Sequence, residues 1–185
     1  EANVKMLASN PTVQHGDESI TSYINKDEKV RPTPLSNGGI EKVIYQGFFN
    51  YINSHPNSAY AYFATKDGSY VQCPATPIKK HYDPRDSRFY KKAMENKGEV
   101  VRTKPYASMR GMGVVARGAS ISVASTVKTR TGEIIGVQGI DVNLDVLTHF
   151  IQQITVATTG YVVMTTGDGT ILAHPRRPNK SAFAD

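Results

Sequence analysis

Apolar side chains recur at helical spacing in one long stretch of the chain, which predicts an amphipathic helix over residues 40–52. The positions that follow the i, i+3, i+4, i+7 order are Ile40, Val43, Ile44, Gly47, Phe48, Tyr51 and Ile52. A weaker stripe begins at Val4, Leu7 and Ala8, is interrupted by Pro11, and is expected to resume with Ile20, Tyr23 and Ile24. The chain is therefore expected to open with helices.

Two segments have the pattern of a β-hairpin, with an apolar run, an Asp-Gly turn and a second apolar run. The first, residues 60–74, reads YAYFATKDGSYVQCP, and the second, residues 161–175, reads YVVMTTGDGTILAHP. A constant offset of 101 residues (161 − 60) aligns Tyr60 with Tyr161 and Pro74 with Pro175. Asp-Gly hairpins are common, so the match can arise by chance. Otherwise it predicts two similar domains in tandem, the second only begun before the chain ends.

Between the hairpins the pattern changes from helical spacing to alternation. A short helix is expected over residues 88–96, and strands over 119–127 and 133–141. Asn143 is expected to cap a further helix that carries Leu144, Leu147, Ile151 and Ile154. Antiparallel strands accompanied by helices predict an α+β domain. Nothing suggests alternating βαβ units, which argues against a parallel dinucleotide-binding sheet.

Composition narrows the class of protein. The 185 residues are 39% hydrophobic and 21% charged, which is typical of one globular domain with an appendage. The net charge of +6 comes from scattered basic residues without zinc or RNA-binding signatures, so no nucleic-acid partner is expected. No apolar run approaches the ~20 residues of a membrane-spanning helix. Because the chain begins with Glu1, we expect an excised piece of a longer protein.

The motifs of common catalytic sites are missing from the sequence. It has no G-x-S-x-G, no P-loop and no H-E-x-x-H, and its five histidines lack metal-ligand spacing. The single cysteine, Cys73, excludes an intrachain disulfide and is expected to be a buried small hydrophobe. We therefore expect neither an enzyme nor a bound cofactor or metal.

Residues 81–90, HYDPRDSRFY, form one place where a ligand is expected. Aromatic walls with an arginine fork suit a small anion, because guanidinium binds a carboxylate through two hydrogen bonds. Alternatively, Asp83 and Asp86 simply pair with Arg85 and Arg88. The residue types alone leave both interpretations open.

Asp141 ends an apolar strand and is the second candidate. By the period of two it shares a face with Val137 and Ile135, where a carboxylate is costly unless it is paired. It is expected either to bind a ligand ammonium group or to accept backbone hydrogen bonds at the adjoining helix start. The small side chains of Ser120, Ser122, Ala124 and Thr126 either line the same cavity or are covered by a helix.

Several of these segments together resemble the double Cache sensor family. The run from Tyr82 to Arg85, followed by Phe89 and Tyr90, is similar to that family's Y-D-P-R-x-R-P-W-Y motif. Pro105–Tyr106, the strand over 120–127, GVQGIDVNLDVL at 136–147 and the segment 160–175 resemble the family in the expected order. The similarity spans about residues 60–175.

The resemblance implies an α+β fold with a long N-terminal helix, a PAS-like antiparallel sheet module distal to the membrane, and the start of a second such module. The implied boundaries are residues 1–58 for the helical region, 59–157 for the distal module and 158–185 for the truncated proximal module. Such domains are extracytoplasmic, periplasmic parts of inner-membrane receptors for chemotaxis or of histidine kinases.

The resemblance also implies what the domain binds: an amino acid, amine or carboxylate in the distal module. Alternatively, the domain is a ligand-free module for homodimerisation or for docking a partner protein. An exposed apolar stripe at Val4 and Leu7 would favour that alternative.

Carried over residue by residue, the family's pocket motif is only partly present. Tyr82 matches the first tyrosine, but the arginine position falls on Ser87 and the tryptophan position on Phe89. Tyr106 matches the next tyrosine, whose aspartate partner falls on Ser108, and Asp141 matches the last acidic position. Arg88 lies beside the lost arginine position. The carboxylate clamp and one ammonium partner are therefore missing, which puts a standard α-amino acid in doubt as the ligand.

The residues expected to bind the ligand come from four segments of the distal module, and the loop from Tyr106 to Gly118 is expected to close over them. They are Tyr82, Arg85, Ser87, Arg88, Phe89, Tyr106, Ser108, Ser122 and Asp141.

Overall fold

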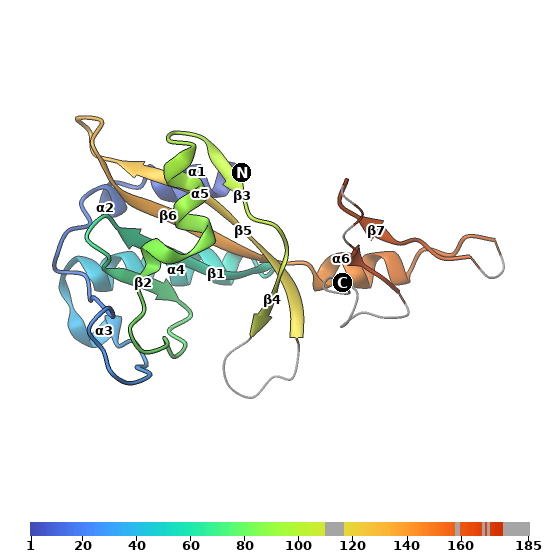
Figure 1. Cartoon of the computed structure of the whole chain (residues 1–185), viewed down its shortest axis with the longest axis horizontal. Helices are drawn as coiled ribbons and strands as arrows, with labels where there is room; N and C mark the ends of the chain where they lie inside the picture. The colour runs from blue at the N-terminus through green and yellow to red at the C-terminus, as the bar shows by residue number, and fades with distance from the viewer. Residues whose placement is uncertain (110–116, 158–159, 168, 170, 176–185) are drawn as a thin grey trace. The chain divides into compact units, whose positions relative to one another are not determined.

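The computed structural model describes residues 1–109, 117–157, 160–167, 169 and 171–175 (Figure 1). The helices are α1 (Ala2–Ala8), α2 (Pro11–Gln14), α3 (Pro34–Asn37), α4 (Gly39–Ser54), the 3-10 turn η1 (Pro84–Asp86), α5 (Arg88–Glu95) and α6 (Asp145–Gln152). The strands are β1 (Ser58–Thr65), β2 (Tyr70–Cys73), β3 (Val100–Arg102), β4 (Tyr106–Met109), β5 (Arg117–Lys128), β6 (Ile134–Asn143), β7 (Met164–Thr165) and β8 (Ile171–Ala173).

The chain folds as two compact units, which are described separately below. The first comprises Glu1–Thr103 and Ser122–Asp141, and the second comprises Lys104–Ile121 and Val142–Asp185. The domain boundaries expected from the sequence stay a prediction.

One sheet carries most of the strands, in the order β2-β1-β6-β5-β3, and β4 pairs with β5. The pairings of β1 with β2, β3 with β5 and β4 with β5 are antiparallel. Neighbouring strands at the centre of the sheet are far apart in the sequence, because β6 lies beside β1. Helices packed on an antiparallel sheet confirm the predicted α+β class.

The first hairpin forms where the sequence predicted it. Tyr62 pairs with Gln72 and Ala64 with Tyr70, and the Thr65 N–H donates to the Ser69 carbonyl across the turn. Gly68 at the turn has φ +97°, a conformation that glycine adopts without steric cost. The Asp-Gly signal thus fixed both the turn and the register of β1 against β2.

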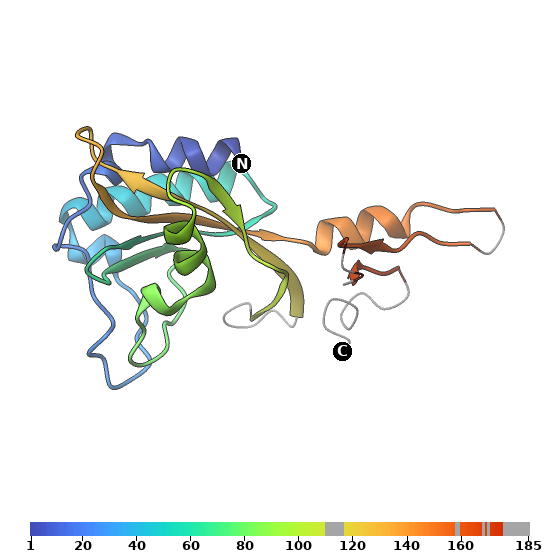
Figure 2. The ribbon, with the colours of Figure 1, turned by 45° about the horizontal axis from the view of Figure 1, so that its top comes forward.

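Helices cover both faces of the sheet in the first unit (Figure 2). Helix α4 contacts β1 and β2 on one face, and its predicted apolar stripe buries Ile44, Phe48 and Tyr51. Each such side chain contributes about 1.5–3 kcal/mol when fully buried. Helix α5 covers the other face, where Phe89, Tyr90 and Ala93 join a cluster with Tyr62 and Val137. Neighbouring residues along β1 therefore belong to two different cores.

The N-terminal stripe was predicted correctly at its start and wrongly at its continuation. Val4 and Leu7 are 1% and 6% exposed, so the apolar stripe of α1 is buried and the exposed stripe that would favour a docking module is not found at these residues. Ile20 to Ile24 are not helical, because this segment pairs along the edge of the hairpin instead. Ser22 bridges to Ser69, and the Tyr70 N–H donates to the Thr21 carbonyl at 2.9 Å. This pairing covers the edge of β2, which would otherwise be open. The helical spacing of residues 20–24 does not reveal it, because the pairing depends on a distant segment of the chain.

The second unit contains α6 and the hairpin of β7 and β8, in which Met164 pairs with Ala173. The repeat of the first hairpin thus also forms an antiparallel pair, although Asp168 lies outside the described residues. The predicted cap of α6 was wrong. Because β6 continues through Asn143, the helix begins after Leu144, which occupies the N-cap without a side-chain hydrogen bond.

Candidate ligand-binding site

Asp141 lies near the end of β6, half-buried on the sheet face that α5 covers. Its Oδ1 accepts hydrogen bonds from the Tyr62 hydroxyl and the Ser122 hydroxyl, both at 2.7 Å. Tyr62 and Ser122 are 3% and 4% exposed, so both donors are fixed by burial. Hydrogen bonds from two hydroxyl groups offset the cost of holding a carboxylate among apolar neighbours. The two hydrogen bonds hold the carboxyl group at a defined point of the sheet.

Gly139 makes this contact possible. A Cβ atom at Gly139 would lie 2.5 Å from Cζ and 2.8 Å from Oη of Tyr62, closer than real Cβ contacts allow. The tyrosine ring therefore lies directly over the glycine, and its hydroxyl reaches the carboxylate two residues further along β6. The Gly-Ile-Asp sequence at 139–141 thus encodes the position of the ring as well as that of the charge.

Aromatic rings pack around Tyr62, the tyrosine that donates to the carboxylate. The ring centroids of Tyr62 and Phe89 are 4.6 Å apart, those of Tyr62 and Tyr70 are 6.0 Å apart, and those of Tyr70 and Tyr82 are 5.1 Å apart. Burial raises the pKa of Tyr82 to about 12, and the nearby charge of Asp141 adds to this shift. Tyr82 is therefore a neutral phenol at physiological pH, within electrostatic reach of Asp141.

The loop over residues 81–90 holds its own ion pair. Arg85 Nε lies 2.9 Å from Oδ1 of Asp83, and Arg85 Nη2 lies 2.7 Å from Oδ2. The hydrogen bonds from Arg85 lower the pKa of Asp83 below its usual range. Arg85 packs against the turn of the first hairpin, where a Cβ at Gly68 would lie 3.2 Å from its Cζ. These contacts match the alternative in which arginine and aspartate of the loop pair with each other.

The other predicted site residues of the loop differ in exposure. The Ser87 hydroxyl donates to the Pro84 carbonyl at the start of α5. Arg88, the first residue of α5, is exposed, whereas Phe89 is 7% exposed in the aromatic cluster. Phe89 is thus the residue of this set that lies against Tyr62.

Two predicted site residues lie in the second unit. Tyr106 and Ser108 are on β4, where they pair with Ser120 and Gly118 of β5. Residues 110–116 of the loop that was expected to close over the ligand lie outside the described residues. The role of this loop stays a prediction.

The small-residue face of β5 is buried, and one of its side chains contacts Asp141. Ser120, Ser122, Ala124 and Thr126 are all buried, and Ala124 packs in the cluster with residues of α5. Ser122 is the member that contacts Asp141. Burial of Ala124 beside α5 matches the interpretation of a helix-covered face, whereas the interpretation of these residues as a cavity wall stays a prediction.

Sequence reasoning missed Tyr62 and Tyr70 as site residues. Both were recognised as part of the hairpin, but their chemistry was not used. The signal was present in the alternation of β1 and β2, which places Tyr62 and Tyr70 on one face.

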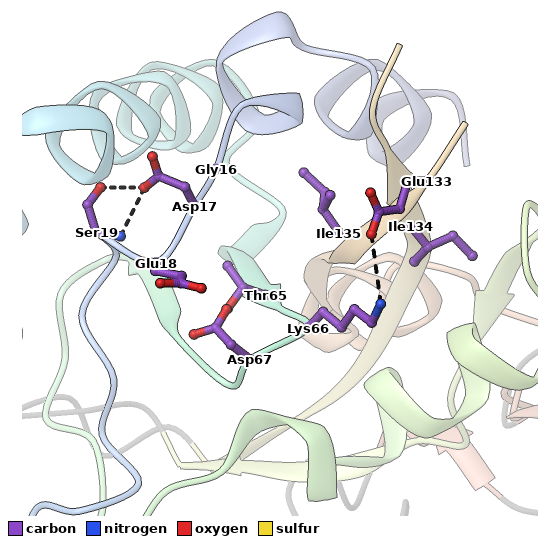
Figure 3. A pocket seen from close by; sticks show the side chains of 10 residues that line it. All are labelled: Gly16, Asp17, Glu18, Ser19, Thr65, Lys66, Asp67, Glu133, Ile134 and Ile135. Atoms are coloured by element: carbon purple, nitrogen blue, oxygen red, sulfur yellow. Dashed lines mark hydrogen bonds and ion pairs between the residues drawn. The ribbon is translucent and has the colours of Figure 1, made fainter. Parts of the chain in front are cut away.

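A groove of about 670 Å³ lies elsewhere in the first unit (Figure 3). Its lining residues come from the loop after α2, the β1–β2 turn and the start of β6: Gly16, Asp17, Glu18, Ser19, Thr65, Lys66, Asp67, Glu133, Ile134 and Ile135. Hydrogen bonds from Ser19 lower the pKa of Asp17, and Lys66 Nζ lies 3.9 Å from Glu133. No predicted site residue lines this groove.

Within the described ranges, no group of three or more His, Cys, Asp or Glu side chains is arranged to hold a metal ion. Likewise, no described helix has the length and apolarity needed to cross a membrane. Cys73 is buried in β2 as predicted, and burial raises the pKa of its thiol.

No family model matches the chain. It is 29% identical over 147 residues to the methyl-accepting chemotaxis protein McpB of Bacillus subtilis, an alignment that covers 80% of this chain and 21% of that relative. The chain thus spans about a fifth of the length of this relative.

Solved structures with the same fold include the ligand-binding domain of the Pseudomonas aeruginosa amino-acid chemoreceptor PctC in complex with GABA. Its TM-score is 0.66 at 21% identity, over 94% of this chain and 64% of that one. The ligand-binding domain of PctB from the same organism, in complex with L-Arg, gives a TM-score of 0.63 at 22% identity, over 96% of this chain and 63% of that one. The chain therefore has the fold of Cache-type chemoreceptor ligand-binding domains and is a sequence relative of methyl-accepting chemotaxis proteins, as its resemblance to the double Cache family predicted.

Proposed function

We propose that the chain is the extracytoplasmic sensing domain of a membrane-anchored methyl-accepting chemotaxis receptor, and that it binds a small solute beside Asp141. The observation that carries this proposal is the half-buried carboxylate whose Oδ1 accepts from Tyr62 and Ser122 among aromatic rings. A fixed charge next to a largely apolar wall is typical of small-molecule sites. The ligands named for PctC and PctB, GABA and L-Arg, both carry a protonated amino group that such a carboxylate suits.

The proposed mechanism is a ligand-dependent change in the population of two arrangements of the domain. A ligand shifts this equilibrium only by its difference in affinity for the two states. On this proposal residues 59–157 form the sensing module, the hairpin of β7 and β8 begins a second one, and the site has no catalytic role. A histidine kinase is the other class of receptor that the sequence suggested for the parent protein.

Thermal melting with a library of amines, amino acids and carboxylates tests the proposal. A ligand at 100 times its dissociation constant stabilises the folded state by about 2.7 kcal/mol, which a melting curve resolves. Asp141→Asn should remove the shift for any ligand that binds here, whereas Glu133→Gln, a substitution in the separate groove, should leave it unchanged. If no compound in the three classes shifts the melting temperature, solute sensing by this domain is wrong.

A second candidate, dimerisation or docking of a partner protein without a solute, draws on different residues. The expected stripe at Val4 and Leu7 is buried, but Val43 and Phe49 of α4 are 49% and 50% exposed. Sedimentation equilibrium of the wild type and of Phe49→Gln separates the candidates. A dimer that is lost in the variant, together with an unshifted melting temperature in every ligand, would favour the second.

A further inference from the structure

We propose that a basic patch in the first unit, formed by residues 26–31 and 78–81, binds a linear phosphate polymer of the cell envelope. The patch contains none of the residues expected to bind the solute, so this inference goes beyond the proposed function. It rests on that function for one point only, the extracytoplasmic position of the domain.

Backbone pairing holds the two segments of the basic patch together, although they are far apart in the sequence. Val30 and Ile78 exchange both backbone hydrogen bonds, at 3.0 and 2.8 Å, and the His81 N–H donates to the Lys26 carbonyl at 2.9 Å. The two segments lie side by side in both views of the chain (Figure 1 and Figure 2). The fold therefore gathers basic residues that look scattered along the sequence.

The basic patch carries an excess of positive charge. Its cations are Lys26, Lys29, Arg31, Lys79 and Lys80, and its anions are Asp27 and Glu28. With histidine neutral, the net charge of these ten residues is +3 (5 − 2), against +6 for the whole chain. Such a concentration of one sign of charge attracts polyanions, and salt screens the attraction beyond about 8 Å at physiological ionic strength.

Lysine side chains of the patch are accessible to a partner. Lys26, Lys29 and Lys80 are exposed, and none of the three forms an ion pair with any residue that the structure describes. The neighbouring carboxylate of Asp27 lies instead 3.5 Å from His81 Nε2. A bound anion therefore does not have to displace a partner from these ammonium groups.

The composition of the basic patch fits a polymer better than a protein surface. Protein interfaces are depleted in lysine and enriched in aromatic residues, methionine and arginine. In the patch, four of the five cations are lysine. None of the large apolar side chains that are exposed in the described part of the chain belongs to it. A partner that binds by charge alone is therefore favoured.

Repeating phosphate groups are the anions that suit these side chains. Lysine is a common phosphate ligand and binds as a point charge, whereas planar recognition of a carboxylate favours arginine. The segment 26–31 spans at most about 18 Å, so its charges are spread over a distance much larger than one phosphate group. A chain of phosphates contacts all the lysines of the patch, whereas a single phosphate reaches only one or two of them.

Nucleic acid is a poorer match than a phosphate polymer without bases. Proteins that bind single-stranded nucleic acid stack its bases on accessible aromatic side chains. Tyr23 and Tyr82, which bridge to each other next to the patch, do not offer such faces. Tyr23 is 2% exposed, and Lys79 Nζ lies 5.8 Å from the ring centroid of the half-buried Tyr82.

Calorimetric titration of the folded chain with long-chain inorganic polyphosphate, at increasing NaCl concentration, tests the inference. Each ion pair on a single-stranded polyanion contributes about −0.7 to the slope of log K against log[NaCl], so four lysines should give a slope of about −3. The fourfold variant Lys26→Gln, Lys29→Gln, Lys79→Gln, Lys80→Gln should weaken binding by about 30-fold and bring the slope close to zero.

A matched control removes the same charge from the same unit. Its substitutions are Lys5→Gln, Lys42→Gln, Lys97→Gln and Lys128→Gln, all at exposed lysines outside the basic patch. The control should bind polyphosphate within about threefold of the wild type, because distant surface charges are screened. Since Lys79 contacts Tyr82, the threefold variant without Lys79→Gln replaces the fourfold one if the latter does not melt cooperatively. Its slope should be reduced by about 2.

Four results would each overturn the inference: no binding of polyphosphate at low salt, equal losses in the patch and control variants, orthophosphate binding as tightly as polyphosphate, or tighter binding of single-stranded DNA or polygalacturonate than of polyphosphate. The proposed function is tested separately. The patch variant should keep the melting shift with solutes, and Asp141→Asn should keep polyphosphate binding. Absence of any solute shift together with patch-dependent polyphosphate binding rejects the solute site and leaves this inference standing.

Discussion

Glu41 on α4 and Asp141 on β6 are both carboxylates that accept hydrogen bonds from neutral donors in the first unit. Glu41 is 1% exposed, and its two oxygens accept from the Thr21 N–H at 3.0 Å, the Thr21 hydroxyl at 2.7 Å and the Asn37 amide at 3.0 Å. Asp141 is only half-buried, and one of its oxygens accepts from two hydroxyl groups.

The two carboxylates thus differ in burial: Glu41 is enclosed by the fold, whereas Asp141 remains partly accessible to solvent. Glu41 ties the segment before α3 to the first turn of α4, and no solute can approach it. Asp141 retains an exposed fraction, so the fold does not enclose its carboxylate as fully as that of Glu41. Each carboxylate also lies near a tyrosine whose pKa it helps to raise, Tyr23 for Glu41 and Tyr82 for Asp141.

The largest expected effect is on Glu41. Glu41→Ala removes the acceptor of the part-buried Thr21 N–H and hydroxyl and empties the space of a side chain that is 1% exposed, and should lower the free energy of unfolding by about 3 kcal/mol. Asp141→Asn should cost less than about 1 kcal/mol, because its surroundings are partly solvated. Urea denaturation of the two variants beside the wild type measures the contrast. Equal losses in the two variants would show that Asp141 is as structural as Glu41.

Gly139→Ala should disturb the surroundings of Asp141 without removing the carboxylate itself. The added Cβ must displace the Tyr62 ring, which should cost about 2 kcal/mol of unfolding free energy and weaken ligand binding. Gly47→Ala is the matched control, since Gly47 lies in α4 with nothing within 4 Å of an added Cβ. The control should gain about 0.5–1 kcal/mol from helix propensity. A neutral Gly139→Ala variant would contradict the packing of Tyr62 described above.

The paired tyrosines give a pH-dependent comparison. Burial raises the pKa of both Tyr23 and Tyr82 from 10.0 to about 12, so the folded state holds these two protons more tightly than the unfolded chain. The resulting stability is complete below pH 10 and is lost as the pH rises towards 12, at a cost of about 2 kcal/mol per tyrosine.

Absorbance titration of the phenolates in Tyr23→Phe and Tyr82→Phe measures this effect. Each variant should lose one late-titrating tyrosine and unfold less readily between pH 10 and 12. Glu41→Gln should lower the midpoint of Tyr23 slightly, and Asp141→Asn that of Tyr82. If the pKa of Tyr82 instead lies near its ordinary value of 10.0, the burial of its side chain described above is wrong.

The smallest expected effect is on the ion pair of the loop. Asp83→Asn leaves Arg85 with a weaker partner and should cost about 0.5–1 kcal/mol, because the pair is partly exposed and screened by salt. The loss of unfolding free energy in Asp83→Asn should be smaller in 1 M NaCl, whereas the loss in Glu41→Ala should not change with salt. If Asp83→Asn loses as much unfolding free energy as Glu41→Ala, Asp83 contributes to stability as a buried carboxylate does.

The parts of the fold that follow from local spacing were predictable. Helix α4, the two hairpins and α5 each carry their own periodicity or turn signal, so no distant partner was needed to recognise them. The segment from Ile20 to Ile24 has helical spacing but lies along a strand edge, which depends on where β2 lies in the sheet. Tertiary pairing there overrides local preference.

The same reasoning identified only part of the candidate site. Asp141 stood out because a carboxylate on an apolar strand is unusual, and the family resemblance pointed to it as well. Its donor Tyr62 is 79 residues away in sequence, and nothing in the local pattern joins them. For Arg85, the residue types left two possible partners open, a ligand anion and an aspartate of the same loop. The choice between them depends on how the loop packs against the hairpin turn.

The alternation along β1 and β6 has a consequence for divergence. Phe63 and Gln138 point into the layer under α4, while Tyr62 and Gly139, their neighbours in the chain, set the geometry around Asp141. Substitutions at alternate positions of these two strands therefore act on one layer of the domain at a time. If the proposed function holds, variants on the Asp141 face change the solute that is bound, and variants on the other face change mainly the stability of the layer under α4.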